Sequence, residues 1–347
     1  MSVNEMMNEI SEMALISKFA KILPRSPYSV NQTHTSDSEI LDVGLDTNYL
    51  AVTTDIISEE ITEGLYSDPH FMGWMAMVVN LSDIAAVGAK PIGMLLSMTV
   101  SPDWDKDFIE KIIQGMAEAC HVHECGSIGG DYNTGVPALG ATALGLVDKN
   151  SVMKRIGMNP GDLVYLTGPA GLGNAFVAIK LLFPDLLDKY PFKPMARIKE
   201  ATIISKYATS CMDTSDGFIF TVDSLFRLNS VAINIDAIDS ICHPAVMMMA
   251  EFGTPPLTFL SGIHGEFELC FTIPPEKEDA FLNEMHSNHF SPVKAGTVYP
   301  EINSRKGVFI NKKLFPSTEA RNLWENSTSA SEYSMNLLKL SSDFLTS

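Results

Sequence analysis

The run MAMVVNLSDIAAV, residues 75–87, is the part of the sequence that decides the fold. Its apolar spacing predicts a long helix from about Phe71 to Val87. Asp83 lies inside this run, where a lone carboxylate is costly to desolvate and needs a compensating positive charge. Asn80 is three residues away, so the two side chains share a helix face and can point at one ligand. An exposed polar stripe at a helix end is the alternative interpretation.

Strand and helix patterns alternate on both sides of this helix. In the first half we expect strands at 49–54, 91–100 and 137–146 and a helix at 105–120. The turn signal Asn-Pro-Gly-Asp at 159–162 opens a second series, with strands at 163–167, 231–235, 268–273 and 308–310 and helices at 173–182, 196–208 and after Asp216. Two comparable halves that meet near residue 150 predict an α/β (α+β) protein with two domains.

We expect four regions along the chain. Residues 1–38 hold a helix over 5–23 and, over 24–38, a Pro, Ser, Thr and Asn-rich mobile linker or loop. Residues 39–150 form the first domain and 151–321 the second. Residues 322–347 form a poorly specified, partly disordered tail.

Composition limits the partners of the chain. The 24 Lys and Arg against 42 Asp and Glu leave a net charge of −18, which argues against binding to nucleic acid. No apolar run reaches the ~20 residues of a bilayer span. The acidic N-terminal stretch lacks the pattern of a signal peptide, and five cysteines without a CxxC pair suit reduced thiols. We therefore expect a cytoplasmic protein without a membrane or nucleic-acid partner.

Several local patterns resemble known binding motifs without matching them. No GxxxxGK[ST] run occurs, which excludes a P-loop. Gly171 and Gly173 follow a strand and open a helix, but the third glycine of a dinucleotide fingerprint would fall on Phe176. The run HVHEC at 121–125 offers zinc-ligand side chains, but its spacing crosses a helix end. We interpret these matches as chance.

Six aspartates carry the chemical signal. Asp55 ends a β run, and Asp131 follows two glycines that let a backbone approach a ligand closely. Around the next helix start, Ser215 and Asp216 have helix capping as the simpler interpretation. Carboxylates gathered at strand ends and helix starts repel one another unless cations lie between them. Several Mg²⁺ ions carrying a polyphosphate fit them better than one calcium cage. The six are Asp46, Asp55, Asp83, Asp131, Asp213 and Asp216.

The run NLSDIAAVGAKP, residues 80–91, resembles the NLSDLAAMGAxP segment of thiamine-monophosphate kinases. These belong to the aminoimidazole ribonucleotide synthase (PurM-like) superfamily. Further segments resemble the family's IGGD, RSGAKPGD, VYVTG, DLSDG and ELCF in the same order. They are IGGD at 128–131, RIG at 155–157 with PGD at 160–162, VYLTG at 164–168, DTSDG at 213–217 and ELCF at 268–271. The resemblance covers roughly residues 40–312.

The resemblance implies a site and an assembly. It makes the six aspartates and Thr54 ligands of Mg²⁺, and it places ATP against Thr53, Gly129, Gly130, Asp131, Arg155 and Ser215. Asp83, Asp131, Asp216 and Arg155 would form the catalytic centre, with Arg155 pairing with phosphate oxygens. It also implies two α/β domains, with the N-terminal domains of two subunits joined in one barrel, and hence a homodimer.

Three departures concern the acceptor side of the site. The family's GDD motif is matched to Gly44-Leu45-Asp46, and the segment from there to Asp55 is shorter than usual. The family's histidine that contacts thiamine phosphate has no counterpart in residues 56–62. The loop SGIHGEFE at 261–268 replaces SGGEDYE, with Glu266 in place of the substrate-facing glutamate. These changes predict an altered acceptor pocket.

We therefore expect an ATP- and Mg²⁺-dependent phosphotransferase. Its partners would be ATP and a small phosphorylated metabolite, with thiamine monophosphate as the best single candidate. One alternative is a related ATP-dependent synthase, ligase or kinase acting on another small molecule. A second alternative is a nucleotide-binding protein without turnover.

Overall fold

The computed structural model of the protein describes residues 11–346. A five-stranded sheet in the first half has the strand order β1-β2-β5-β3-β4. Its strands are β1 (Glu39–Leu41), β2 (Asn48–Ile57), β3 (Lys90–Val100), β4 (Ser127–Thr134) and β5 (Ala138–Asp148). β3 and β4 are parallel and are joined by α5 (Lys106–Val122), whereas the other neighbours are antiparallel. β4 is not among the strands expected from the sequence, because its glycines give no strand pattern.

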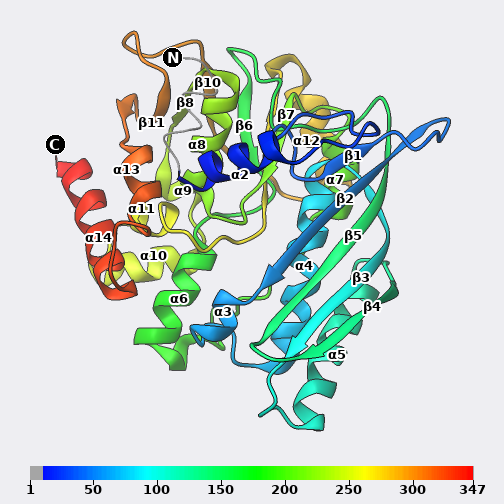
Figure 1. The fold of residues 1–347 in the computed structure, drawn as a ribbon. Coiled ribbons are helices and arrows are strands. Elements are labelled where there is room, and N and C mark those ends of the chain that lie inside the picture. The colour runs from blue at the N-terminus through cyan, green and yellow to red at the C-terminus, as the bar shows by residue number, and fades with distance from the viewer. Residues whose placement is uncertain (1–10, 347) are drawn as a thin grey trace.

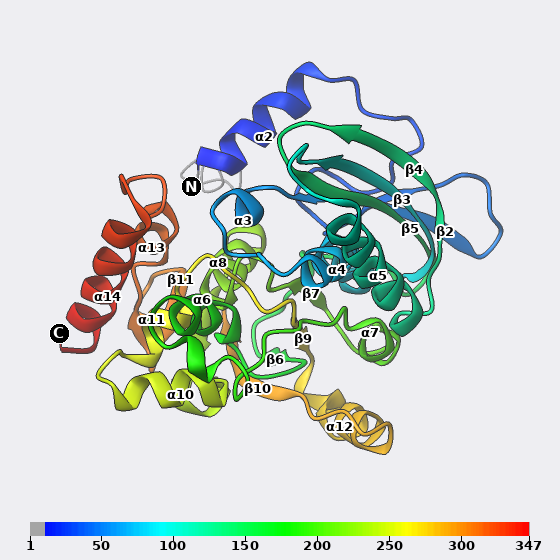
Figure 2. The same ribbon diagram turned by 90° about the horizontal axis from the view of Figure 1, so that it is seen from below.

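Helix α4 (Pro69–Ala86) is the buried helix that the apolar run predicts. Asp68 accepts the N–H of Phe71 at 2.7 Å and Pro69 opens the first turn, which fixes the helix start. The helix packs against β2 and β5 of the first sheet and against β7 and α7 of the second half. Because both halves cover it, its sequence is apolar on nearly all sides. Figure 2 shows α4 and α5 on one face of the five-stranded sheet.

The second half contains a seven-stranded sheet with the order β12-β11-β8-β10-β6-β9-β7. Its strands are β6 (Leu163–Leu166), β7 (Ser210–Asp213), β8 (Ala232–Ile235), β9 (Leu269–Ile273), β10 (Val293–Tyr299), β11 (Gly307–Ile310) and β12 (Lys313–Leu314). Together the two sheets give the expected mixed α/β (α+β) architecture (Figure 1).

Helices cover both faces of the seven-stranded sheet. One face packs against α6 (Leu172–Leu182), α8 (Phe218–Asn229), α9 (Ile238–Ile241), α10 (Pro244–Glu251), α11 (Pro256–Leu260), α13 (Ser317–Asn322) and α14 (Ala330–Thr346). The other packs against α7 (Ile198–Ile204) and α12 (Glu278–Ser287), together with the end of α4. The remaining helices are α2 (Ser11–Ile22), α3 (Glu59–Thr62) and two short 3₁₀ turns, Pro184–Leu186 and Pro275–Lys277.

The carboxyl ends of four strands lie at one edge of this sheet. β7, β6 and β8 run in one direction because each is antiparallel to β9 or β10, which lie between them. β11 is parallel to β8. The segments that follow Leu166, Asp213, Ile235 and Ile310 therefore meet at the same edge, which is where ligands bind in sheets of this kind.

Two predictions about the chain ends are wrong. The stretch before β1 is not a mobile linker: Asn31 is buried, Ser29 forms a β-bridge with Leu41, and Thr35 accepts the backbone N–H of Arg155. The tail is not disordered, because α14 buries Leu340 and Phe344 against the second half. The predicted helix over 5–23 is described from Ser11 onward, and its earlier part lies outside the described residues.

The two halves are joined by polar contacts as well as by α4. Trp74 Nε1 donates to the carbonyl of Pro194 at 2.7 Å, and Lys180 Nζ donates to the carbonyl of Leu65 at 2.6 Å.

All five cysteines are free thiols. Over residues 11–346, no helix has both the length and the apolar character of a membrane span.

Candidate metal and nucleotide site

Three carboxylates from distant parts of the chain meet between the two halves. One oxygen each of Asp37, Asp83 and Asp213 lies within 4.8 Å of the other two. Asp213 is buried, and the side chain of Asp37 has no exposed surface. We call these three residues the acidic cluster.

The fold explains why these residues meet. The antiparallel register that pairs Glu39 with Val52 directs the chain before β1, with Asp37, toward the end of β2. Asp83 lies in the last turn of α4, and α4 packs against β7, which ends at Asp213. The cluster therefore forms where the first sheet, α4 and the carboxyl edge of the second sheet come together.

Hydroxyl groups hold the carboxylates in place. Thr53 Oγ1 donates to Asp83 Oδ2 at 2.6 Å. Ser82 Oγ donates to Asp213 Oδ2 at 2.6 Å, and Ser215 Oγ donates to Asp213 Oδ1 at 3.0 Å. Each bond orients an oxygen without adding positive charge.

Asn80 has a different role from the one predicted. It is fully buried and does not point with Asp83 at a ligand. Its Oδ1 accepts the backbone N–H of Asp55 at 2.8 Å, and its Nδ2 donates to the carbonyl of Asp55 at 3.2 Å. Asn80 thus fixes the backbone of Asp55 next to the cluster.

Arg155 supplies the positive charge that Asp83 was expected to need. Its Nε and Nη2 donate to Asp37 Oδ1 at 3.2 and 2.9 Å. Burial alone would lower the pKa of Arg155, but Asp37, Asp83 and Asp213 together raise it above its ordinary value. The guanidinium is therefore a permanent cation beside three carboxylates.

One cation does not balance the cluster. Burial raises the pKa of Asp83 well above its ordinary value, and the charges of Asp213, Asp55 and Asp37 add to the effect. Burial, and then the charge of Asp37, raise the pKa of Asp213 to about 7, against the hydrogen bonds from Ser82 and Ser215. Without a further cation the site holds protons that these carboxyls would normally release.

The donor set fits a hard divalent cation. Within the described part of the chain, the buried Oδ2 of Asp37 has no hydrogen-bond partner. Such an oxygen is costly to bury unless something binds it. All the candidate ligand atoms of the cluster are carboxylate oxygens, which Mg²⁺ prefers, and none is the nitrogen or sulfur typical of zinc.

Three further predicted residues differ in their position relative to the cluster. Asp55 shares a strand face with Thr53, toward α4, and its charge raises the pKa of Asp83. Thr54 alternates to the other face, where its hydroxyl donates to the carbonyl of Ala141 at 3.0 Å and is unavailable to the cluster. Asp216 is exposed in the turn between β7 and α8.

The placement of Asp46 in the site is wrong. Asp46 is exposed in the connection between β1 and β2. From Asn48 to Asp55 the strand rises about 23 Å, so this connection lies at the far end of the hairpin from the cluster. Asp37 takes the position expected for Asp46, which accounts for the short segment before Asp55.

The structure also separates Asp131 from the acidic cluster of its own chain. One row of paired residues crosses the sheet from β4 to β2. It consists of Asp131 in β4, Ser97 in β3, Gly140 in β5 and Ile56 in β2. Side chains in such a row share one face, and Ile56 is on the face opposite Asp55. Asp131 is exposed there and accepts Asn133 Nδ2 at 2.8 Å.

The two glycines before Asp131 are explained by strand pairing. A Cβ atom on Gly130 would lie 2.3 Å from the carbonyl oxygen of Leu96. Gly129 has a φ of +140° in the same edge strand. The close approach of β4 to β3 therefore requires the missing side chain of Gly130, and the positive φ of Gly129 favours glycine there, whatever a ligand requires.

Glu266 is not open to an acceptor, contrary to the prediction. It is 4% exposed, and its Oε2 accepts the N–H of Gly171 at 2.9 Å at the start of α6. Burial raises the pKa of Glu266 to about 8, against the hydrogen bond from Gly171. In a dinucleotide-binding fingerprint a phosphate binds at the start of the helix. Here the Glu266 carboxyl lies at that position, next to Gly171.

The ring nitrogens of two histidines have hydrogen-bond partners within the protein. His123 Nδ1 lies 2.8 Å from the carbonyl of Ala119 and its Nε2 accepts the N–H of Ala196, so both nitrogens have partners and no zinc site is supported. His264 Nε2 lies 3.0 Å from Tyr66 Oη, shortly after the segment 56–62 that lacks the family's histidine. Burial lowers the pKa of His264 to about 4, so it is neutral and does not replace a phosphate-binding cation.

Sequence reasoning missed Asp37. It stands in TSDSE, a polar stretch that resembles a linker, and no apolar neighbour marks its burial. The available signal was the short segment between Asp46 and Asp55, which indicated that the first acidic position lies farther upstream.

Known proteins resemble this chain in sequence. Residues 35–147 match the family described as AIR synthase related protein, N-terminal domain. The thiamine-monophosphate kinase of Buchnera aphidicola (subsp. Acyrthosiphon pisum) is 26% identical over 321 residues, which cover 88% of this chain and 98% of that one. The thiamine-monophosphate kinase of Escherichia coli K12 is 29% identical over 272 residues, covering 76% and 82%.

A solved structure shares the fold. The structure of AaThiL complexed with AMPPCP and TMP has a TM-score of 0.73 and 22% identity, covering 89% of this chain and 96% of that one. Residues 35–147 are therefore similar to the N-terminal domain of AIR synthase related proteins. Over most of its length the chain is similar to thiamine-monophosphate kinases.

Proposed function

We propose that this protein is an ATP- and Mg²⁺-dependent phosphotransferase whose acceptor is thiamine monophosphate. The observation that carries the proposal is the acidic cluster, three carboxylates within 4.8 Å beside one arginine. The relatives named thiamine-monophosphate kinase support the choice of acceptor.

The chain's residues would divide the work of phosphoryl transfer. Asp37, Asp83 and Asp213, with Asp55 and Asp216 nearby, would hold Mg²⁺, which when bound neutralises the charge of the triphosphate. Separately, Arg155 would pair with a phosphate oxygen through the N–H groups that Asp37 does not use.

The acceptor explains why no strong base is needed. A phosphate monoester is ionised near neutral pH and attacks without losing a proton to the protein. Positioning and charge neutralisation then carry the rate. The buried Glu266 and the neutral His264 are consistent with this, since neither is available as a base on an open surface.

The test is product analysis with ATP, Mg²⁺ and thiamine monophosphate. We expect ADP and thiamine diphosphate in equal amounts. ADP with free phosphate and an altered acceptor would indicate a synthase or ligase. Binding of ATP without ADP release for any phosphorylated metabolite would indicate a nucleotide-binding protein and would refute the kinase proposal.

We further propose a homodimer formed through the uncovered face of the first sheet. Antiparallel sheets with one solvated face usually carry polar residues there, but this face carries Ile56 (54% exposed), Leu95 (41% exposed), Leu144 and Leu146. Asp131 lies on the same face. A second copy packed on it would bring Asp131 to the partner's site, so we assign Asp131, Gly129 and Gly130 to the nucleotide site in trans.

Two broader expectations accompany this function. The division into regions 39–150 and 151–321 is supported by the two sheets and is testable by limited proteolysis at the segment between them. A cytoplasmic location is supported by the five free thiols and is testable by fractionation.

A further inference from the structure

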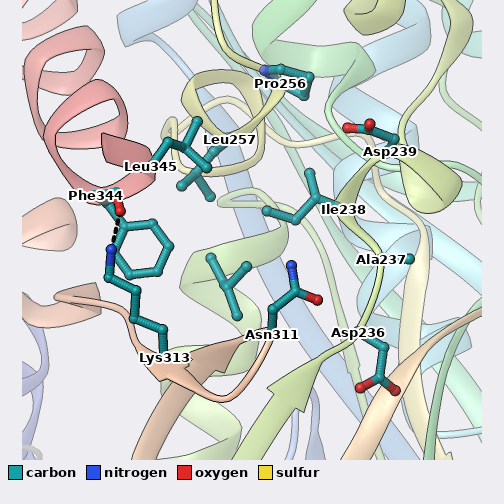
Figure 3. Close-up of a pocket in the computed structure, with 11 residues that line it drawn as sticks. Asp236, Ala237, Ile238, Asp239, Pro256, Leu257, Asn311, Lys313, Phe344 and Leu345 are labelled. Carbon is teal, nitrogen blue, oxygen red and sulfur yellow. Dashed lines mark hydrogen bonds between the residues drawn. The ribbon is translucent and has the colours of Figure 1, made fainter. Parts of the chain in front are cut away.

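A cavity of about 560 Å³ lies in the second half, away from the acidic cluster. It opens where β8 and β11 end, and the turn between β11 and β12, α9, α11 and the end of α14 surround it (Figure 3). Its apolar wall consists of Ile238, Pro256, Leu257, Ile310, Phe344 and Leu345. Its polar residues are Asp236, Asp239, Asn311 and Lys313.

The cavity is separate from the proposed phosphotransfer site. Asp213 ends β7 at one side of the sheet, whereas Asp236 follows β8, with β9, β6 and β10 between them. Four strand spacings correspond to about 19 Å. No residue of the acidic cluster lines the cavity.

Its position and size are those of a ligand site. β8 and β11 are parallel neighbours, and small molecules bind beyond the carboxyl ends of such strands. A volume of this size falls within the range of about 300–1,000 Å³ found for small-molecule pockets.

One wall of the cavity is held firmly. Asn311 and Lys312 form a two-residue turn with φ values of +50° and +65°. The N–H of Lys312 donates to Asn234 Oδ1 at 2.6 Å, and Asn234 is fully buried. The turn therefore presents Asn311, whose side chain points into the cavity in Figure 3, from a fixed position.

The charges around the cavity favour a cation. Figure 3 shows the Asp239 carboxylate directed toward the cavity, with Asp236 at its rim. The carboxyl end of α14, which carries negative partial charge, ends at the same place. Lys313, the one cation of the lining, donates to the carbonyl of Phe344 and lies 4.3 Å over its ring. Its charge is thus engaged by the wall itself.

We propose that this cavity binds a small organic cation with an apolar or aromatic body. The charged end lies against Asp239, and the body packs on Ile238, Leu257 and Phe344. The site is additional to the phosphotransfer site and needs neither ATP nor Mg²⁺.

Three probes that share a phenyl ring on a short chain and differ in charge test the ligand class. They are phenethylamine, 2-phenylethanol and 3-phenylpropanoate, titrated into the full-length protein with methyl-labelled Ile and Leu. We expect phenethylamine to shift the methyl signals of Ile238, Leu257 and Ile310 saturably. The alcohol should bind at least ~5-fold more weakly and the carboxylate more weakly still.

Variants locate the binding. Asp239→Asn should lower the affinity for phenethylamine to that of the alcohol, and the matched surface variant Asp188→Asn should leave it unchanged. Leu345→Trp should fill the cavity and abolish binding of all three probes. Equal binding of the three probes, shifts confined to other methyl groups, no shift at ~10 mM probe, or an unchanged affinity in Asp239→Asn would each overturn the proposal.

Discussion

Replacing Asp37 by Asn removes one negative charge from the acidic cluster and keeps the size of the side chain. Asp46→Asn makes the same chemical change at the exposed turn between β1 and β2. If the cluster binds Mg²⁺, the first variant loses the effect of Mg²⁺ on stability and the second keeps it. The pair therefore compares the residue that the structure selects with the one that the sequence pattern selected.

The magnitude follows from the distances. At an effective dielectric constant of about 20, two unit charges 4.8 Å apart interact by about 3.5 kcal/mol. When Asp83 and Asp213 are both ionised, Asp37→Asn removes one such repulsion with each, together about 7 kcal/mol at a separation of 4.8 Å. It also removes the attraction to Arg155 at 2.9 Å, about 6 kcal/mol. At a pH at which Asp83 and Asp213 are both ionised, the two changes nearly cancel, and without Mg²⁺ the free energy of unfolding should then change by less than about 2 kcal/mol.

With Mg²⁺ the two variants should differ. At about 100 times its Kd, Mg²⁺ stabilises the wild type by about 2.7 kcal/mol, and a tenfold weaker Kd reduces this to about 1.4 kcal/mol. We expect at least that loss for Asp37→Asn and none for Asp46→Asn, measured by urea denaturation with and without Mg²⁺. Turnover should fall at least ~100-fold in Asp37→Asn only. Retained Mg²⁺ stabilisation in Asp37→Asn, or its loss in Asp46→Asn, would refute the reasoning.

Three further predictions follow from the same geometry. Because burial raises the folded-state pKa of Asp213 to about 7 and that of Asp83 well above its ordinary value, the folded protein binds more protons than the unfolded chain between about pH 4 and 7. Stability without Mg²⁺ should therefore fall as pH rises through this window. In Asp213→Asn, the slope of the urea midpoint against pH should be flatter than in the wild type. An unchanged slope would argue against the raised pKa of Asp213. If Asp131 acts in trans, mixing inactive Asp131→Asn and Asp83→Asn chains should restore about a quarter of wild-type activity through heterodimers with one intact site, whereas no recovery would place Asp131 in cis. Lys312→Gly should raise the free energy of unfolding by about 0.5–1 kcal/mol because glycine adopts φ > 0 without strain, and a lowered Tm would contradict this.

Local patterns predict the parts of this structure whose residues act with their sequence neighbours. The apolar run around Asp83 predicts α4, and the β patterns predict β2, β3 and β5, because periodicity directly reflects burial. β4 has no such pattern, because the close approach of the Leu96 backbone requires glycine at position 130. α14 is set by packing against the second half, which its Ser and Asn-rich surroundings do not reveal.

The site is predictable only in part for the same reason. Asp83 and Asp213 are visible because carboxylates next to apolar segments need an explanation. Asp37 is invisible because its burial depends on Arg155 and on the register of β1 with β2, which no local pattern encodes. The faces of Asp131 and Thr54 depend likewise on strand register, where a shift of one residue exchanges the two sides of a sheet.

The central claim is that the acidic cluster binds divalent cations next to the phosphates of ATP. Anomalous X-ray scattering from crystals of the full-length protein with Mn²⁺ and a non-hydrolysable ATP analogue tests it most directly. We predict at least one Mn²⁺ peak about 2.2 Å from carboxylate oxygens of Asp37, Asp83 or Asp213. A bound nucleotide with no Mn²⁺ peak at these three residues would contradict the account.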